Sequence, residues 1–201
     1  MQIIEQGAVA DQIIEQGAVA EQTISKSKFL AWTAYCENER EVAAFLRAIA
    51  AQHPHASHLA YAFRLKTSDG IVPRFSDAGE PSGTAGMPIL QRIEGLHLMN
   101  ACVGVIRYYG GINLGKGGLA RAYGGTAKLA LDASTLGAYI EMQQLSLTIA
   151  YNRLDALTKA LSHINGEILD KSFDEKVHIV IRLPLAEQQA FMNRFTNEYA
   201  N

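Results

Sequence analysis

Residues 100–123 read NACVGVIRYYGGINLGKGGLARAY, and this stretch decides the fold of the first half of the chain. Asn100–Tyr108 is an almost unbroken apolar run, which predicts a strand buried on both faces of a sheet. Gly117–Ala133 shows apolar residues at helical spacing. A glycine-rich turn therefore joins a buried strand to a helix, and in that setting backbone N–H groups can hold a phosphate.

The turn itself matches no standard nucleotide motif. Its glycines fit neither the P-loop nor the GxGxxG spacing: Gly110, Gly111, Gly115, Gly117 and Gly118. Arg107, Lys116 and Arg121 place positive charge beside it, which favours an anion-binding turn. The alternative is purely structural, because glycines also permit a tight crossover from strand to helix.

A second unusual stretch is Arg74–Pro88, with the sequence RFSDAGEPSGTAGMP. Its small residues allow a sharp turn and lead into an expected helix over Thr84–Gly95. The amides of that helix start can receive an anion, which makes candidates of Ser82, Gly83 and Thr84. Asp77 and Glu80 can instead bind a hard cation, pair with a Lys or Arg, or cap the helix, and the sequence leaves these alternatives open.

Acid–base candidates are His58, Asp77 and Glu80, because His58 begins a predicted strand that should run beside the Asp77/Glu80 loop. His53 and His55 lie close to His58 in sequence, but their spacing matches no standard metal-ligand set. No nucleophile–histidine grouping can be assembled from the sequence order. We therefore expect no bound metal and no cofactor, and we assign no catalytic residue.

The composition is that of a globular protein with a sizeable core: 48% of the 201 residues are hydrophobic and 19% are charged. A net charge of −2 argues against coating nucleic acid by charge alone, although it leaves room for a local basic patch. No apolar window approaches the roughly 18 residues of a membrane span, and no secretory signal is present. Cys36 and Cys102 lie in apolar runs outside any CxxC spacing, so we expect buried, reduced thiols and a cytoplasmic protein.

The N-terminus contains a perfect repeat, because Gln2–Ala10 (QIIEQGAVA) recurs as Gln12–Ala20. A period of ten residues is too short for a solenoid unit. Each copy can form one strand, with Gly7 or Gly17 at a bend. We interpret residues 1–20 as a redundant duplicated leader.

Near Gly137 the pattern changes. From Leu145 onward it predicts strand, helix, strand, strand and helix, which is a ferredoxin-like half-sandwich without its closing strand. We therefore expect a first domain over residues 21–137 and a second over residues 142–201. The missing strand would leave an open sheet edge, which a second copy of the chain or the leader can cover.

Several ordered motifs together closely resemble the IMPACT/YigZ family. They are Ser27-Lys28-Phe29, Ala56-x-His58-x-x-Tyr61-Ala62, the run from Ser76 to Gly86, and the run from Arg107 to Tyr123. The resemblance implies an α+β protein of two domains. The first would be like the second domain of ribosomal protein S5 and domain four of elongation factor G, and the second like domain five of that factor.

The resemblance also implies a link to translation, since eukaryotic relatives control translation initiation under amino-acid stress. Our leading hypothesis is a non-enzymatic, translation-associated regulatory protein that binds RNA or a ribosomal or translation-factor surface, with Tyr108, Tyr109 or Tyr123 available to stack on a base. The alternatives are an enzyme acting on a phosphorylated or anionic small molecule, and a protein-interaction module. The proposed contact residues are Arg74, Ser82, Gly83, Thr84, Arg107, Tyr108, Gly110, Gly111, Lys116, Gly117, Gly118 and Arg121.

Overall fold

The computed structural model describes residues 11–196, and the chain divides into two compact units, residues 1–139 and 140–201. Both units mix helices with antiparallel strands. The two-domain α+β architecture expected from the sequence is confirmed.

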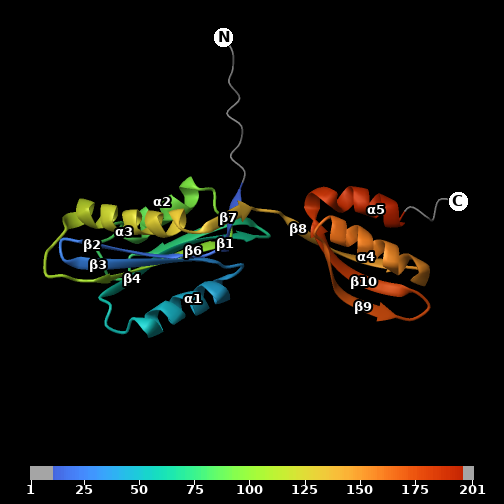
Figure 1. Ribbon diagram of the computed structural model, residues 1–201, viewed down its shortest axis with the longest axis horizontal. Coiled ribbons are helices and arrows are strands. Elements are labelled where there is room, and N and C mark those ends of the chain that lie inside the picture. The colour runs from blue at the N-terminus through green and yellow to red at the C-terminus, as the bar shows by residue number, and fades with distance from the viewer. Residues whose placement is uncertain (1–10, 197–201) are drawn as a thin grey trace, which may run out of the picture. The chain divides into compact units, whose positions relative to one another are not determined.

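The main sheet of the first unit has five antiparallel strands in the order β2-β3-β6-β4-β5. Helices α2 and α3 cover one face and α1 covers the other (Figure 1). The strands are β2 (Val19–Ile24), β3 (Ser27–Tyr35), β4 (His58–Thr67), β5 (Gly70–Ser76) and β6 (Ala101–Tyr108). The helices are α1 (Glu39–Gln52), α2 (Gly86–Gly95) and α3 (Gly115–Asp132).

Strand β6 lies at the centre of this sheet, and every residue from Ala101 to Arg107 is buried, as its unbroken apolar sequence predicts. Val103 and Val105 belong to the core under α2 and α3. Cys102 belongs to a smaller core under α1 that also holds Cys36, and both thiols are free and buried, which confirms the expectation for them.

A capping residue in the sequence fixes where one helix begins, whereas one strand forms only because it pairs with a neighbouring strand. Asn38, a residue type that favours the N-cap position, caps α1: its side-chain oxygen accepts a hydrogen bond from the Glu41 amide at 3.0 Å. Strand β5 was not predicted from the sequence. It forms because its residues pair along β4 at the sheet edge, where Pro73 is tolerated.

The second copy of the repeat is part of the first unit. Gln12–Gln16 forms β1, which pairs with the short strand β7 (Thr135–Ala138), and the copy ends inside β2. Ile14 is only 1% exposed and packs into the core. The interpretation of residues 1–20 as a redundant leader therefore does not hold for Gln12–Ala20, while Gln2–Ala10 lies outside the described residues.

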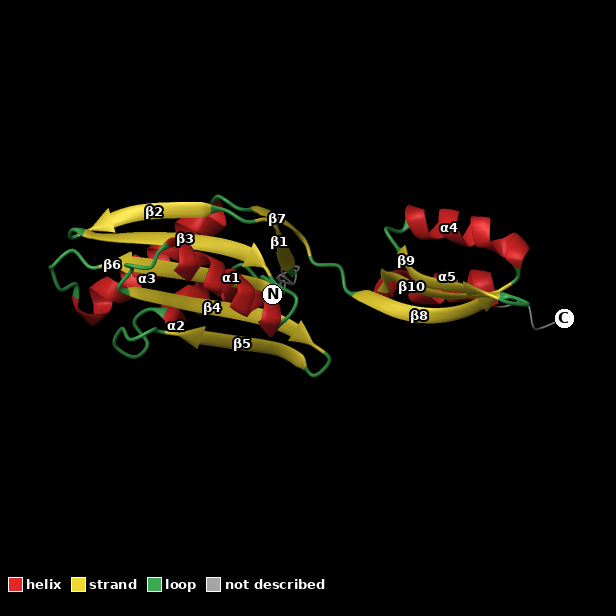
Figure 2. Cartoon of the chain, turned by 90° about the horizontal axis from the view of Figure 1, so that it is seen from below, coloured by secondary structure: helices red, strands yellow, loops and turns green. Residues whose placement is uncertain are grey.

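The second unit is a three-stranded antiparallel sheet in the order β8-β10-β9 with two helices on one face (Figure 2). Within the described chain, β8 pairs only with β10, which leaves the open edge that the missing closing strand predicts. Its elements are β8 (Met142–Ile149), α4 (Leu154–His163), β9 (Glu167–Phe173), β10 (Val177–Pro184) and α5 (Gln188–Thr196), with short 3-10 turns at Tyr151–Arg153 and Leu185–Glu187.

None of the helices within residues 11–196 is both long enough and apolar enough to cross a membrane.

Candidate functional site

The two unusual stretches of the sequence, residues 74–88 and 107–123, meet where β6 ends and α2 and α3 begin. Glu80, from the loop before α2, accepts hydrogen bonds from Arg107 Nη1 at 2.8 Å and from the Tyr123 hydroxyl at 2.9 Å, both on Oε1. The side chains of Glu80 and Arg107 are only 5% and 6% exposed, and Tyr123 is fully buried. The Glu80 carboxylate therefore joins the loop before α2 to the central strand β6 and to helix α3.

Arg107 is held on several sides. Its Nη2 donates to Ser27 Oγ at 3.3 Å, and its guanidinium lies 5.6 Å from the ring centre of Phe29 and 5.1 Å from that of Tyr109. Both distances are within the range of cation–π attraction. Its Nε is buried and has no hydrogen-bond partner in the described part of the chain. A cation this enclosed depends on Glu80 for its charge balance.

Tyr123 serves this cluster as a hydrogen-bond donor. Burial, and then the neighbouring Glu80 carboxylate, raise the pKa of Tyr123 far above its usual range. The phenol therefore stays protonated throughout the physiological pH range, and its O–H donates to Glu80.

Asp77 caps α2. Its carboxylate accepts hydrogen bonds from the amides of Gly83 at 2.8 Å, Ala85 at 2.9 Å and Gly86 at 2.8 Å. Burial alone would raise the pKa of Asp77, but these three donors outweigh it and lower the pKa. Of the alternatives left open by the sequence, the structure shows helix capping for Asp77 and pairing with an arginine for Glu80.

The expected anion site at the start of α2 is thus filled by the chain's own carboxylate. The Gly83 amide is bound to Asp77, and the Thr84 hydroxyl donates to the Pro81 carbonyl at 2.6 Å. Ser82 remains exposed. Among residues 11–196, no group of three or more His, Cys, Asp or Glu side chains is placed to hold a metal ion.

His58 reaches the cluster from the start of β4. Its Nδ1 lies 2.9 Å from the Ala78 carbonyl oxygen, and because a carbonyl only accepts, Nδ1 carries the proton. Its Nε2 lies 3.9 Å from Glu80 Oε1, and the side chain is 26% exposed. The three acid–base candidates therefore lie in one region, where Glu80 is buried and His58 and Asp77 are partly exposed.

The glycine-rich turn packs directly on the turn between β2 and β3. The Gly110 amide donates to Ser27 Oγ at 3.2 Å, and a Cβ atom at Gly110 would lie 2.0 Å from the Lys26 carbonyl oxygen. Only glycine permits this approach. Gly111 has a φ of +84°, which reverses the chain toward α3.

The outer side of this turn carries exposed cations. Lys26, Lys116 and Arg121 are exposed and have no ion-pair partner in the part of the chain that the structure describes. Tyr109, which follows β6 at the start of the turn, is 49% exposed. Helix α3 begins without a side-chain cap or an acidic residue in its first turn, where Gly115, Gly117 and Gly118 place no side chain over the amides.

Two of the predicted contact residues lie elsewhere. Arg74 pairs across the strands with Phe63, so it faces the α1 side of the sheet, where it lines a groove of about 330 Å³. Tyr108 also faces α1, and its hydroxyl lies 2.9 Å from His53 Nδ1. Strand alternation separates both from Arg107, which points to the α2 and α3 side.

Sequence reasoning missed two residues of this region, Lys26 and Ser27. Ser27 is fully buried, and its hydroxyl oxygen accepts from both Arg107 and Gly110. Its place in the first family motif was a signal for it. Lys26 carried no signal, because only the contact with Gly110 brings it to the glycine-rich turn.

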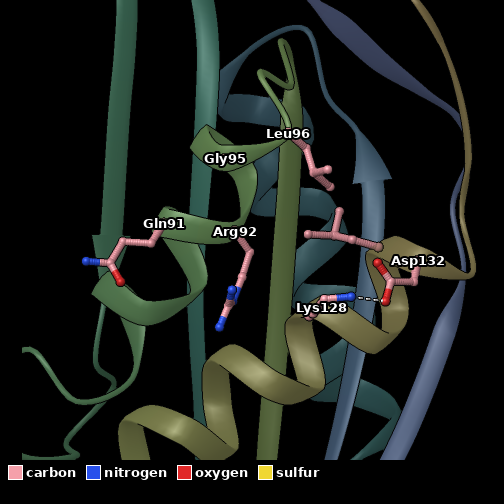
Figure 3. Close-up of a pocket in the computed structure, with 7 residues that line it drawn as sticks. Gln91, Arg92, Gly95, Leu96, Lys128 and Asp132 are labelled. Atoms are coloured by element: carbon pink, nitrogen blue, oxygen red, sulfur yellow. Dashed lines mark hydrogen bonds and ion pairs between the residues drawn. The ribbon is translucent and has the colours of Figure 1, made fainter.

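A groove between the C-terminal halves of α2 and α3 was also not anticipated (Figure 3). It has a volume of about 220 Å³ and a largely apolar lining that includes Leu96. Its charged groups are engaged with the protein: Lys128 pairs with Asp132, and Arg92 Nε donates to the Gly124 carbonyl at 3.3 Å. The groove therefore lacks the unpaired cations that mark the outer turn.

Each of the two units matches a known protein-family model. Residues 25–131 match the model of the Impact N-terminal domain, and residues 147–198 match a domain of unknown function, DUF1949. The chain is 34% identical over 167 residues to the IMPACT family member YigZ of Escherichia coli K12, which covers 83% of this chain and 82% of that protein.

Two further similarities extend over most of the chain. An IMPACT family member of Thermus thermophilus is 38% identical over 162 residues, covering 79% of this chain and 85% of that protein. A solved structure described as a hypothetical protein has a TM-score of 0.73 at 31% identity, and covers 92% of this chain and 90% of that one.

Proposed function

Because this chain belongs to the IMPACT family, we propose that it is a translation-associated protein that binds RNA, free or on the ribosome, through the outer side of its glycine-rich turn. Binding requires no catalytic step in this proposal. The observation that carries it is the group of exposed cations around this turn that have no ion-pair partner among the described residues: Lys26 on the β2–β3 turn, and Lys116 and Arg121 on α3.

The charge at this end of the first unit favours a phosphate backbone. Of the carboxylates nearby, Glu80 is paired with the buried Arg107, and Asp77 is directed at three backbone amides and not at an exposed cation. A local positive surface therefore forms on a chain whose net charge is −2. Such a patch attracts phosphates at short range while the whole protein is not basic.

Two features would help the turn to hold single-stranded RNA. Tyr109 exposes part of its ring, on which a base can stack. The first turn of α3 carries the positive end of the helix dipole and bears Lys116 beside three glycines. Of the three tyrosines considered from sequence, Tyr109 is the exposed one, so the proposal uses it in place of Tyr108 and Tyr123.

The test is binding of a short mixed-sequence RNA and of purified ribosomes across a salt series. We expect saturable binding that weakens between about 50 and 200 mM salt. In Lys116→Ala/Arg121→Ala, the slope of log K against log salt should become shallower by about 1.4, since each single-strand phosphate contact contributes about 0.7. Arg40→Ala/Arg47→Ala, two exposed cations of α1, is the matched control and should keep the wild-type slope.

Two outcomes would contradict the proposal. One is indifference to RNA and ribosomes at low salt. The other is an equal loss in the two double variants, because a general charge effect would then explain the binding. Binding that persists while Tyr109→Ala weakens it without changing the salt slope would identify stacking as the second contribution.

A second candidate function rests on His58. Its ring is held in one tautomer by the Ala78 carbonyl, and its Nε2 faces the buried Glu80 carboxylate while the side chain keeps 26% exposure. This is an arrangement suited to acid–base chemistry on a small anionic substrate. Turnover of p-nitrophenyl phosphate that disappears in His58→Asn would favour this function, and absence of turnover in the wild type would exclude this substrate.

A further inference from the structure

We propose that the two copies of the N-terminal repeat are interchangeable strands. In this proposal Gln2–Ala10 can take the place of Gln12–Ala20 in β1 and β2, so that the first unit folds in two registers that are ten residues apart. The inference uses the contacts of the second copy and the identity of the two sequences.

The contacts of β1 depend on particular residues that both copies contain. Ile14 is 1% exposed in the core. The Gln12 backbone donates to the His97 carbonyl at 3.1 Å and accepts from the Met99 amide at 2.7 Å, while its side-chain Nε2 donates to the Leu96 carbonyl at 3.1 Å. Gln2 and Ile4 offer the same groups at the same spacing.

The most demanding position of the segment is also duplicated. A Cβ atom at Gly17 would lie 2.1 Å from the Thr33 carbonyl oxygen, so only glycine fits there. The next residue, Ala18, exchanges hydrogen bonds with Thr33: its amide donates to Oγ1 at 2.8 Å, and its carbonyl accepts from the Thr33 amide at 3.1 Å. The first copy has glycine and alanine at the corresponding positions.

The segment that would be exchanged ends in β2, and the place of β2 in the sheet makes a second register possible. Val19 and Ala20 belong to β2, which is an edge strand of the five-stranded sheet. In the alternative register, residues 11–20 form a loop that leaves this edge between Ala10 and Glu21. No strand among the described residues lies beyond β2 in that sheet, so the loop has room to leave it.

The alternative register keeps the residue types of the segment, but it must close a ten-residue loop and interrupt β2 at Glu21, because Ala10 and Glu21 are not bonded to each other. The length-dependent part of loop closure scales as the three-halves power of length, which is a factor of about thirty for ten residues. The described register therefore dominates in the wild type. Damage to the second copy would make the other register the dominant fold.

Four full-length proteins test this: wild type, Ile4→Asp, Ile14→Asp and the double variant. Urea unfolding should show no change for Ile4→Asp. The folding constant should fall at least about thirtyfold for Ile14→Asp, because thirtyfold is the length-dependent part of the loop cost. It should fall more than about a thousandfold for the double variant, which must bury an aspartate in either register.

A second readout follows the loop directly. Residues 11–20 leave the sheet in the alternative register, so cleavage after Glu15 by the glutamate-specific protease Glu-C should be faster in Ile14→Asp than in the wild type. The proposal is overturned if Ile14→Asp loses as much stability as the double variant, or fails to fold. It is equally overturned if Ile14→Asp folds with unchanged cleavage after Glu15.

Discussion

The inner and outer sides of the same two motifs use charge in opposite ways. On the inner side, Glu80, Arg107 and Tyr123 are buried and bonded to one another. On the outer side, Lys116 and Arg121 are exposed and have no ion-pair partner within residues 11–196. Residues a few positions apart in sequence therefore either hold the loops together or remain available to a ligand. This difference can be tested by changing one side at a time.

The largest effect is expected from Glu80→Ala. It leaves the Arg107 guanidinium buried without its anion, which should lower the free energy of unfolding by about 3–5 kcal/mol. The matched outer variant, Lys116→Ala/Arg121→Ala, should stay within about 0.5 kcal/mol of wild type. Urea unfolding at constant salt measures both. A loss below about 1 kcal/mol for Glu80→Ala would mean that the inner cluster is not structural.

Glycine substitutions give the next largest contrast. At Gly110 a Cβ atom would collide with the Lys26 backbone, so Gly110→Ala should cost about 2–3 kcal/mol. At Gly117 the nearest neighbour of a Cβ atom is Arg121 Nη1 at 3.5 Å, so Gly117→Ala should stabilise α3 by about 0.5–1 kcal/mol. Thermal and urea unfolding should both show a loss of stability for Gly110→Ala and a gain for Gly117→Ala. Equal losses at both positions would contradict the close contact between Gly110 and Lys26.

The smallest of the three expected losses of stability concerns the cap of α2. Asp77→Ala removes the acceptor of three amides and should cost about 1–2 kcal/mol at neutral pH. The pKa of Asp77 is lowered by folding, so its contribution is present above the ordinary carboxyl value of about 3.9 and is lost as the pH falls through the lowered value.

The stability of the wild type should therefore fall more steeply than that of Asp77→Ala below about pH 4. Urea unfolding between about pH 2 and pH 7 would show the two curves converging in acid. Parallel curves over this range would indicate that Asp77 is not titrating as a cap, and Asp69→Ala, an exposed carboxylate of the β4–β5 turn, serves as the control.

Elements with a strong local signal were predictable. The buried strand β6, the Asn38 cap of α1 and the strand–helix–strand–strand–helix order of the second unit all follow from apolar periodicity and capping residues. Strands β5 and β7 were not predicted. Both are short or lie at an edge, and they are strands because a partner strand offers them hydrogen bonds, which no local pattern shows.

The candidate site divides in the same manner. Its two motifs, residues 74–88 and 107–123, were visible as unusual sequence, but their convergence was not. The sequence did not show that Asp77 caps a helix and that Glu80 pairs with an arginine, because either carboxylate could fill either role by its local chemistry. Likewise, the placement of Arg74 on the α1 side and of Lys26 beside Gly110 depends on strand register and on contacts far apart in sequence.

The sequence alone determined the family, the two-domain α+β class and the segments of interest, since these depend on residue types and their spacing along the chain. Only the tertiary structure decided which charges are buried in pairs and which face solvent. That outcome depends on the side of the sheet each side chain takes and on the neighbours that long-range packing brings to it.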